Sequence, residues 1–447
     1  MGTSSAETPA DRQLFMHPLE ASDFQPWRHV PSAKQMLFER ALAPETAIGG
    51  IVSPQTPEAL ATVIRESDRQ TILPCGAGSK LAWGGIIQQP ETDSSLLVLS
   101  TERLNRLIDH AVGDLTVTVE AGMRFADVQT ILAKAGQFLA IDPAHPDQAT
   151  IGGIVATADT GSLRQRYNSV RDMLLGLSFV RADGQLAKAG GRVVKNVAGY
   201  DLMKLLTGSY GTLGIITQVT FRVYPLPEAS QTVVLSGEAS AIAQAAQTVH
   251  SSALTSASAD LCSASVVTEL GIGKGMGLAI RLQSILPSVQ EQANRLIQLG
   301  EAIGLATVHL TGQDDVTLWQ RLQERITAAH QTEVITCKIG IQPSEAVALL
   351  TEIDRLSTPP WCGQIHIASG LGRLVFDATT PPETLLSIRS ICQTNSGFLS
   401  LLQAPITLKQ AIDVWGYAGN ALPIMRQLKQ QFDPHHRLSP HRFVGEI

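Results

Sequence analysis

Cysteine is sparse in this 447-residue chain, and its five cysteines stand far apart. They are Cys75, Cys262, Cys337, Cys362 and Cys392, and none belongs to a CxxC pair. Zinc ribbons, iron–sulfur clusters and disulfide frameworks need clustered or regularly spaced cysteines, so this spacing argues against all three. We therefore predict free thiols, as is typical of a reducing cytoplasm, and no metal site.

An excess of positive charge and long apolar runs are also missing. The net charge of −6 and the pI near 6.0 argue against the basic surface of a nucleic-acid-binding protein. No run approaches the ~18 apolar residues that a membrane span needs, and the opening MGTSSAETPADRQ predicts no signal peptide. With 44% hydrophobic and 17% charged residues, the chain is expected to be soluble and to form two or three domains.

What the sequence does have is a glycine-rich stretch, DPAHPDQATIGGIVATADTG, which runs from Asp142 to Gly161. Gly152 and Gly153 let the backbone approach a ligand that a Cβ atom would keep away. Thr150 is expected to cap a short helix over 151–158. A glycine pair in an apolar run is equally typical of a tight packing contact, so this stretch alone leaves packing and ligand binding open.

A second glycine-rich stretch, PCGAGSKLAWGG, covers residues 74–85 and follows a predicted strand at 71–73. Successive N–H groups in such a turn can form a concavity that binds anions. The stretch is neither a GxxxxGK[ST] phosphate loop nor a GxGxxG dinucleotide fingerprint. Taken together, the two stretches predict backbone nests that clamp one pyrophosphate.

Strands and helices alternate around these stretches, which indicates an α+β or α/β sheet. Thr56 and Asp201 are predicted helix caps, since their side chains can accept backbone N–H bonds. Asp183-Gly184 lies between two β-prone runs and predicts a hairpin. An apolar strand over 215–223 is expected to close this part of the chain.

Five ordered motifs carry a family resemblance: PCGAGS, DP…ATIGG, the Asp-Gly hairpin, KNVAGYDL and GTLGIIT. They resemble the flavin-binding domain of the vanillyl-alcohol-oxidase and p-cresol-methylhydroxylase (PCMH) superfamily, and within it the FAD-binding subunits of glycolate oxidase (glycolate dehydrogenase) complexes. The resemblance implies an α+β fold, with a PCMH-type FAD-binding part of two subdomains followed by an α/β cap. The implied domains are a partly disordered extension (1–43), the FAD domain (44–225), the cap (226–410) and a segment returning to the FAD domain (411–447).

The resemblance also implies which residues contact FAD. These are Pro74, Gly76, Ala77, Gly78, Ser79, Pro143, Thr150, Ile151, Gly152, Gly153, Ala156, Thr157, Gly161, Gly214, Ile215 and Ile216. Some relatives attach the flavin covalently through a histidine in the first loop. No histidine stands between Pro74 and Gly85 here, so we expect non-covalent FAD.

The chain departs from its relatives where they bind substrate. Related 2-hydroxy-acid dehydrogenases carry Arg-Lys-Asp-Asn-Thr before GYDL, and that Arg and Thr hold the substrate carboxylate. Val194 and Ala198 replace them here, while Lys195 remains. The HxGDGNxH motif of the relatives is reduced to His366, and a lone histidine is more often structural. Lys195, His366 and Arg373 are the catalytic candidates.

Two further segments invite a ligand interpretation. GIGKGMG, at 271–277, has no helical pattern directly after it, so we favour a turn between strands over a phosphate loop. The tail FDPHHRLSPHRFVGEI contains three histidines, but the adjacent His435 and His436 diverge in direction. A role in docking the tail onto the FAD domain is favoured over metal binding.

The function implied by the resemblance is FAD-dependent oxidation of glycolate or another small 2-hydroxy acid. The implied partners are a catalytic flavoprotein subunit and an iron–sulfur subunit that takes the electrons. The expected location is the cytoplasm, or the inner membrane surface through the complex. Two alternatives stay open: a non-catalytic assembly subunit that keeps a flavin fold, and a stand-alone FAD-dependent D-2-hydroxy-acid dehydrogenase.

Overall fold

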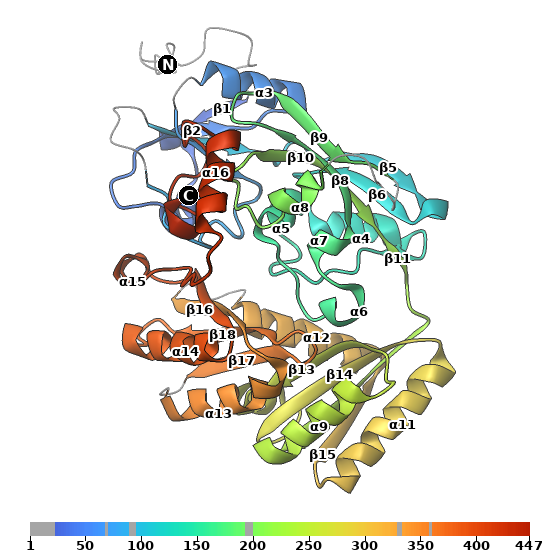
Figure 1. Cartoon of the computed structure of the whole chain (residues 1–447). Coiled ribbons are helices and arrows are strands. Elements are labelled where there is room, and N and C mark those ends of the chain that lie inside the picture. The colour runs from blue at the N-terminus through green and yellow to red at the C-terminus, as the bar shows by residue number, and fades with distance from the viewer. Residues whose placement is uncertain (1–22, 68–69, 89–94, 193–199, 329–332, 357–359) are drawn as a thin grey trace, which may run out of the picture.

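The structure is a computed structural model, and it describes residues 23–67, 70–88, 95–192, 200–328, 333–356 and 360–447. The chain forms two units, one above the other in Figure 1. The first unit is built on two sheets, and the second on one large sheet. The C-terminal segment crosses back from the second unit to the first (Figure 1).

The first sheet has the strand order β1-β2-β4-β3, with β1 antiparallel and the others parallel. Its elements are β1 (Phe24–Pro26), α2 (Ser32–Glu39), β2 (Ile48–Val52), α3 (Pro57–Glu66), β3 (Ile72–Cys75) and β4 (Leu96–Ser100). The predicted cap of α3 is confirmed, because the Thr56 hydroxyl accepts from the Ala59 N–H at 3.1 Å.

Residues 23–43 belong to this sheet and its core, although the sequence suggested a loose extension. Phe24 pairs with Val52, and Phe38 is almost fully buried. These apolar contacts hold the segment against the sheet, although its sequence shows no clear helical or strand periodicity that would have predicted them. The expectation of disorder for residues 1–22 lies outside the described residues.

The second sheet is antiparallel, in the order β5-β6-β10-β8-β9. The elements of this part of the chain are β5 (Leu107–Ala111), β6 (Thr116–Glu120), α4 (Phe125–Ala133), β7 (Gln137–Phe138), α5 (Ile151–Thr157), α6 (Arg164–Tyr167), α7 (Val170–Met173), β8 (Leu174–Val180), β9 (Leu186–Gly190), α8 (Leu202–Leu206), β10 (Ile215–Arg222) and β11 (Tyr224–Pro225). β7 and β11 pair with each other in a separate two-stranded sheet. The β8–β9 hairpin confirms the Asp-Gly turn. Asp201 does not cap α8, because its carboxylate pairs with Lys204 at 2.7 Å.

The second unit holds an eight-stranded sheet in the order β15-β12-β14-β13-β17-β18-β16-β19. The strands are β12 (Ala229–Gly237), β13 (Ser256–Cys262), β14 (Met276–Ser284), β15 (Ala306–Thr311), β16 (Val334–Gly340), β17 (Trp361–His366), β18 (Leu371–Asp377) and β19 (Phe398–Gln403). The helices are α9 (Ala239–Ser251), α10 (Ala264–Leu270), α11 (Leu286–Ala302), α12 (Gly312–Thr327), α13 (Ala346–Leu356) and α14 (Pro382–Thr394). GIGKGMG forms a turn, but it follows helix α10 rather than a strand, and its last two residues begin β14.

This sheet is an internal duplication that the sequence did not reveal. β12–β15 and β16–β19 have the same spatial order, 4-1-3-2, with a crossover helix after the first and third strands, and they are joined where β13 pairs with β17. The first set also carries α10 between its second and third strands. Every pair of neighbouring strands in this sheet is antiparallel. Helices and strands alternate in the sequence because each crossover helix connects two strands that have a third strand between them. The mixed helix-and-sheet class is confirmed, whereas a parallel cap sheet is not what forms.

The two faces of the cap sheet differ in polarity. Leu278, Ile280, Leu374 and Phe376 belong to the core under helices such as α9 and α13. Because side chains alternate along a strand, their neighbours face the other way. That second face carries the polar side chains Ser258, Asp260, Arg281, Lys338, Gln364, His366 and Arg373. It is turned in part toward the first unit, since Gln364 hydrogen-bonds Ser162 at 2.9 Å.

The C-terminal segment contains α15 (Ile406–Ala411) and α16 (Leu422–Phe432) and ends against the first unit. Leu438 forms a bridge with Ile72 at the edge of β3. Four short 3-10 helices complete the description, at Trp27–His29, Val112–Asp114, Pro343–Glu345 and Val444–Glu446.

Candidate functional site

The two glycine-rich stretches meet in one cleft of the first unit. The cleft has a volume of about 660 Å³ and is open to solvent. Thirteen of the sixteen residues predicted to contact the cofactor line it: Pro74, Gly76, Ala77, Gly78, Ser79, Thr150, Gly152, Gly153, Ala156, Thr157, Gly214, Ile215 and Ile216. Segments that are up to 140 residues apart in the sequence therefore form a single wall.

Glycine is required where these segments touch. A Cβ atom on Gly76 would lie 2.0 Å from Thr150 Oγ1, so the two loops could not approach as they do. Gly78 has a φ of +81°, in the left-handed region that favours glycine. The predicted cap of α5 is confirmed, because the Thr150 hydroxyl accepts from the Gly153 N–H at 3.4 Å. The result is a backbone surface with room for a ligand.

Three of the predicted residues lie outside the cleft lining. The Pro143 carbonyl accepts a hydrogen bond from Gln323 of α12 at 2.7 Å, which ties the loop to the second unit. The Gly161 N–H donates to Asp142 at 3.0 Å. Ile151 is fully buried in the core below α5. These positions shape the loop around the cleft, and the spacing of the motif could not separate that role from direct contact.

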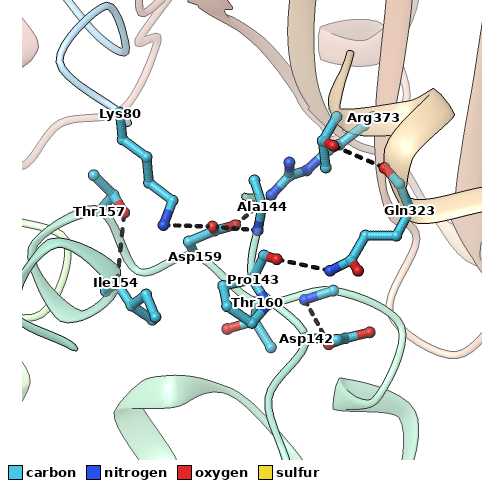
Figure 2. A network of polar contacts seen from close by, with 12 residues as sticks. Lys80, Asp142, Pro143, Ala144, Ile154, Thr157, Asp159, Thr160, Gln323 and Arg373 are labelled. Atoms are coloured by element: carbon cyan, nitrogen blue, oxygen red, sulfur yellow. Dashed lines mark hydrogen bonds and ion pairs between the residues drawn. The ribbon is translucent and has the colours of Figure 1, made fainter. Parts of the chain in front are cut away.

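A buried ion cluster lies beside the cleft (Figure 2). Asp159, which is 2% exposed, pairs with Lys80 at 3.1 Å and with Arg373 of β18 in the second unit, and it accepts from the Ala144 N–H at 2.8 Å. Burial alone would raise the pKa of Asp159, but the two cations outweigh burial and hold this pKa below its ordinary value. Both cations also lie over the ring of Trp83, at 5.8 and 5.1 Å from its centroid.

A comparison with protein families matches residues 48–190 to a family described as an FAD binding domain. The match contains both glycine-rich stretches and the hairpin between β8 and β9. The chain carries an FAD-binding domain. FAD is therefore the cofactor of this domain, and we call the cleft between its two glycine-rich stretches the FAD cleft.

Relatives with known names agree with this assignment. The chain is 37% identical over 166 residues to glycolate oxidase subunit GlcE of Escherichia coli (strain K12), covering 37% of this chain and 45% of that protein. It is 32% identical over 201 residues to glycolate oxidase subunit GlcD of Bacillus subtilis (strain 168), covering 44% and 41%. D-2-hydroxyglutarate dehydrogenase of Xanthomonas citri pv. viticola is 34% identical over 187 residues, covering 41% and 39%. The chain thus spans less than half the length of each of these relatives.

Solved structures share the fold over nearly the whole chain. A structure of p-cresol methylhydroxylase with substrate bound has a TM-score of 0.71 at 15% identity and covers 92% of this chain and 93% of its own. An alkyldihydroxyacetonephosphate synthase has a TM-score of 0.68 at 16% identity, covering 88% and 76%. The fold is therefore PCMH-type, as the sequence predicted.

Arg442, from the C-terminal tail that was predicted to dock onto the FAD domain, lines the cleft but was not among the predicted cofactor contacts. It is 4% exposed, and its Nη2 donates to the carbonyls of Lys80 and Leu81 at 3.3 and 3.1 Å. Its Nε has no hydrogen-bond partner among the described residues. Burial lowers the pKa of Arg442 to about 10. A buried, incompletely paired cation beside a glycine-lined surface fits an anionic dinucleotide such as FAD. Other lining residues that the sequence missed are Cys75, Lys80, Leu81, Thr101, Tyr210 and Gly211.

Lys409 of α15 hydrogen-bonds the same loop, over residues 80–84, that Arg442 contacts. Its Nζ, in a side chain that is 6% exposed, donates to the carbonyls of Ala82 and Gly84 at 2.5 and 2.8 Å. Lys409 and Arg442 thus bind four carbonyls between residues 80 and 84. Both cations add positive potential next to the loop that lines the FAD cleft. The sequence shows an ordinary lysine at this position, and only the return of the C-terminal segment gives it this role.

Lys409 is expected to make stability depend on pH. Burial, followed by the nearby Arg442 guanidinium, lowers the pKa of Lys409 to about 7. Between pH 7 and about 10.5 the unfolded chain therefore binds more protons at this site, so stability rises with pH and is lost as pH falls through 7. From pH 7 to 9 we expect the unfolding free energy of the wild type to rise relative to that of Lys409→Met, by at most about 1.4 kcal/mol per pH unit.

Urea denaturation at both pH values measures this difference. Lys274→Met removes an exposed lysine of the second unit and is expected to keep the wild-type pH dependence. An unchanged pH dependence in Lys409→Met would contradict the assignment.

The three catalytic candidates have different surroundings. His366, 7% exposed, lines a second cleft of about 810 Å³ between the two units, and its Nδ1 lies 2.5 Å from Asp260 Oδ1. Arg373 lines that second cleft and also pairs with Asp159. Lys195 lies outside the described residues. The ion cluster therefore stands between the FAD cleft, which Lys80 lines, and the second cleft.

The remaining predictions about metals, thiols and membranes can be compared with the described residues. None of the five cysteines forms a disulfide, and all are buried. Over the described ranges, no group of three or more His, Cys, Asp or Glu side chains could hold a metal ion. No described helix is long and apolar enough to cross a membrane.

Proposed function

We propose that this chain is the FAD-binding subunit of a 2-hydroxy-acid oxidoreductase, with glycolate as the substrate we favour and FAD held non-covalently. The observation that carries the proposal is the FAD cleft, which ends at a buried cluster of cations facing a second cleft between the units. When bound, FAD supplies a two-electron acceptor for hydride. Relatives named as glycolate oxidase subunits support the substrate class.

In this proposal the side chains at the boundary of the FAD cleft and the second cleft bind and orient the substrate. Arg373 and Lys80 attract its carboxylate, because both cations share the single carboxylate of Asp159. His366 accepts the hydroxyl proton: with Nδ1–H donating to Asp260, its Nε2 is the nitrogen left to take a proton.

The proposal includes a partner that takes the electrons. The five scattered cysteines supply no ligand set for an iron–sulfur cluster, so a one-electron acceptor of this kind would belong to another subunit. GlcD and GlcE are both named as subunits, which supports a complex with a catalytic flavoprotein chain. We place this complex in the cytoplasm or at the inner membrane surface.

One observation favours a second candidate, a non-catalytic assembly subunit that retains FAD. Val194 and Ala198 stand where catalytic relatives carry the Arg and Thr that anchor the substrate carboxylate. A stand-alone D-2-hydroxy-acid dehydrogenase is the third candidate, which the D-2-hydroxyglutarate dehydrogenase relative supports.

The visible spectrum of the purified full chain tests these candidates. We expect a yellow protein that releases its flavin on denaturation, and bleaching on anaerobic addition of glycolate or D-lactate. Bleaching without any partner assigns the chemistry to this chain. A yellow protein that neither substrate bleaches, alone or with its partner subunits, would support the assembly role. A chain that stays colourless with added FAD would contradict the proposal.

A further inference from the structure

The carboxylate of Asp159 is shared between the two units (Figure 2). Its Oδ2 lies 3.1 Å from the Lys80 ammonium of the FAD domain, and its Oδ1 accepts a hydrogen bond from the Arg373 guanidinium of the cap sheet. The Ala144 N–H donates to the same carboxylate at 2.8 Å and so holds it in place. Because the Asp159 side chain is fully buried, water screens these interactions little. A single carboxylate therefore serves two cations that belong to different units.

Lys80 is the member of this cluster that faces the cofactor site. It lines the FAD cleft, whereas Arg373 lines the second cleft and not the FAD cleft. Burial lowers the pKa of Lys80, Asp159 raises it, and Arg373 lowers it. These two side chains are thus the charges that act on the Lys80 ammonium. A change at Asp159 or at Arg373 consequently alters the positive potential that Lys80 presents to the FAD cleft.

The flavin ring is the part of the cofactor on which this potential would act. In the proposed function, hydride passes to FAD from a substrate at the boundary of the two clefts, so the ring faces this boundary, where Lys80 stands. A hydride brings two electrons and one proton into the ring, which therefore gains one negative charge. A fixed cation stabilises that charge and favours the reduced state of FAD over the oxidised state.

We propose that the cluster of Lys80, Asp159 and Arg373 sets the reduction potential of FAD and couples this potential to the docking of the cap. Arg373 binds the Asp159 carboxylate, so less of its negative charge neutralises Lys80 and more of the ammonium charge acts on the flavin ring. Without Arg373, Asp159 pairs with Lys80 alone. Arg373 is in this sense a positioning residue, since it acts on the ring through Asp159 and Lys80. This inference rests on the proposed function, which places the ring at the boundary of the two clefts.

The midpoint potential of the FAD-loaded full chain, measured without substrate, tests this arrangement. Equilibration with reference dyes under anaerobic conditions gives the potential from the flavin spectrum. We expect Lys80→Met to lower the potential by ~30 mV, which corresponds to ~10-fold weaker binding of reduced FAD relative to oxidised FAD in a two-electron couple. Arg373→Met is expected to lower the potential as well, because Asp159 then neutralises Lys80 more fully. Asp159→Asn is expected to raise the potential, because the amide removes the negative charge with little change in shape.

A double variant shows whether Arg373 acts through Lys80. In Lys80→Met there is no ammonium for Asp159 to neutralise. Adding Arg373→Met to this variant is therefore expected to lower the potential by less than Arg373→Met does in the wild type. Shifts that simply add would show that the two cations act on the flavin independently, and they would overturn the coupling through Asp159.

Two controls make the outcome specific. Lys134→Met removes an exposed lysine just after α4 of the FAD domain and is expected to keep the wild-type potential. Titration of the FAD-free protein, followed by flavin fluorescence, is expected to give the same affinity for oxidised FAD in the wild type and in Lys80→Met. Equal losses of affinity for oxidised and reduced FAD would instead assign Lys80 to the phosphates and overturn its action on the ring.

The FAD content of each variant, read from its spectrum, checks that the variant folds. If Lys80→Met does not retain FAD, Arg373→Met carries the test, because Arg373 stands outside the lining of the FAD cleft.

The failure of this inference can be told apart from the failure of the proposed function, because no substrate enters the measurement. An unchanged potential in Lys80→Met or in Arg373→Met, in a chain that glycolate bleaches, overturns the inference and keeps the proposed function. Shifts of the expected sign, in a chain that no 2-hydroxy acid bleaches, keep the inference and reject oxidation on this chain.

Discussion

Replacing Gly153 by valine is expected to abolish FAD binding while leaving the protein folded. Gly153 lines the FAD cleft, and a Cβ atom there would meet only the Thr150 hydroxyl, at 3.2 Å. The added side chain therefore enters the space of the ligand rather than the core. We expect the affinity for FAD to fall at least ~100-fold, which corresponds to about 2.7 kcal/mol. Flavin fluorescence during titration of the FAD-free protein measures this loss.

Gly152 is the comparison variant, because it also lines the cleft but its Cβ position points into the core. A Cβ atom on Gly152 would lie 2.8 Å from the Cβ of Ala121, just after β6. Gly152→Val is therefore expected to destabilise the FAD domain itself, as overpacking does, typically by about 1–3 kcal/mol. If Gly153→Val binds FAD like the wild type, the cofactor does not pass over this glycine and the site is misplaced.

Removing the carboxylate of Asp433 is expected to produce the largest loss of stability. Asp433 and Lys429 of α16 form an ion pair at 2.6 Å with both side chains fully buried. Lys429 also donates to the carbonyls of Thr212 and Leu438, at 2.8 and 3.0 Å. Asp433→Ala leaves the ammonium buried without its counter-charge, which costs about 3–5 kcal/mol of unfolding free energy. Urea denaturation followed by circular dichroism measures this cost.

A double variant separates the ion pair from the packing around it. Lys429→Met combined with Asp433→Ala leaves no unpaired charge, so it is expected to recover part of the stability lost in Asp433→Ala. The affinity for FAD is expected to fall in Asp433→Ala and to recover in part in the double variant, because Thr212 stands two residues before Gly214, which lines the cleft. Equal stability of the wild type and Asp433→Ala would contradict the role of this pair in holding the tail.

The backbone conformation of the cofactor site could be predicted from the sequence because it depends on residues that are close together along the chain. Thr56 and Thr150 each accept the N–H of a residue three positions later. Asp183-Gly184 turns the chain between two strands that are adjacent in the sequence. Glycines tolerate close approach and positive φ whatever surrounds them, so their pattern indicated a ligand surface before the partner strands were known. The same reasoning failed at Asp201, where a neighbouring lysine competes for the carboxylate.

The charged part of the site could not be predicted, because it depends on contacts across hundreds of residues. Asp159 stands inside the opening glycine-rich stretch, yet its partner Arg373 is 214 positions away. Lys409 reaches Gly84 across 325 positions. Lys338 and Arg373 become neighbours only through the strand order of a duplicated sheet. Nothing in the local sequence distinguishes such a lysine from one on the surface.

The sequence by itself predicted two glycine-rich backbone segments that could clamp a pyrophosphate, because close approach of the backbone is a property of residue type, and the family resemblance indicated that the ligand is a flavin nucleotide. The tertiary structure decided which charges lie at the end of that cleft, because a buried charge is defined by what packs around it. Folding of the second unit and the tail onto the FAD domain turns Lys80 and Arg442 from ordinary surface residue types into buried cations, and places the partly buried Arg373 against Asp159.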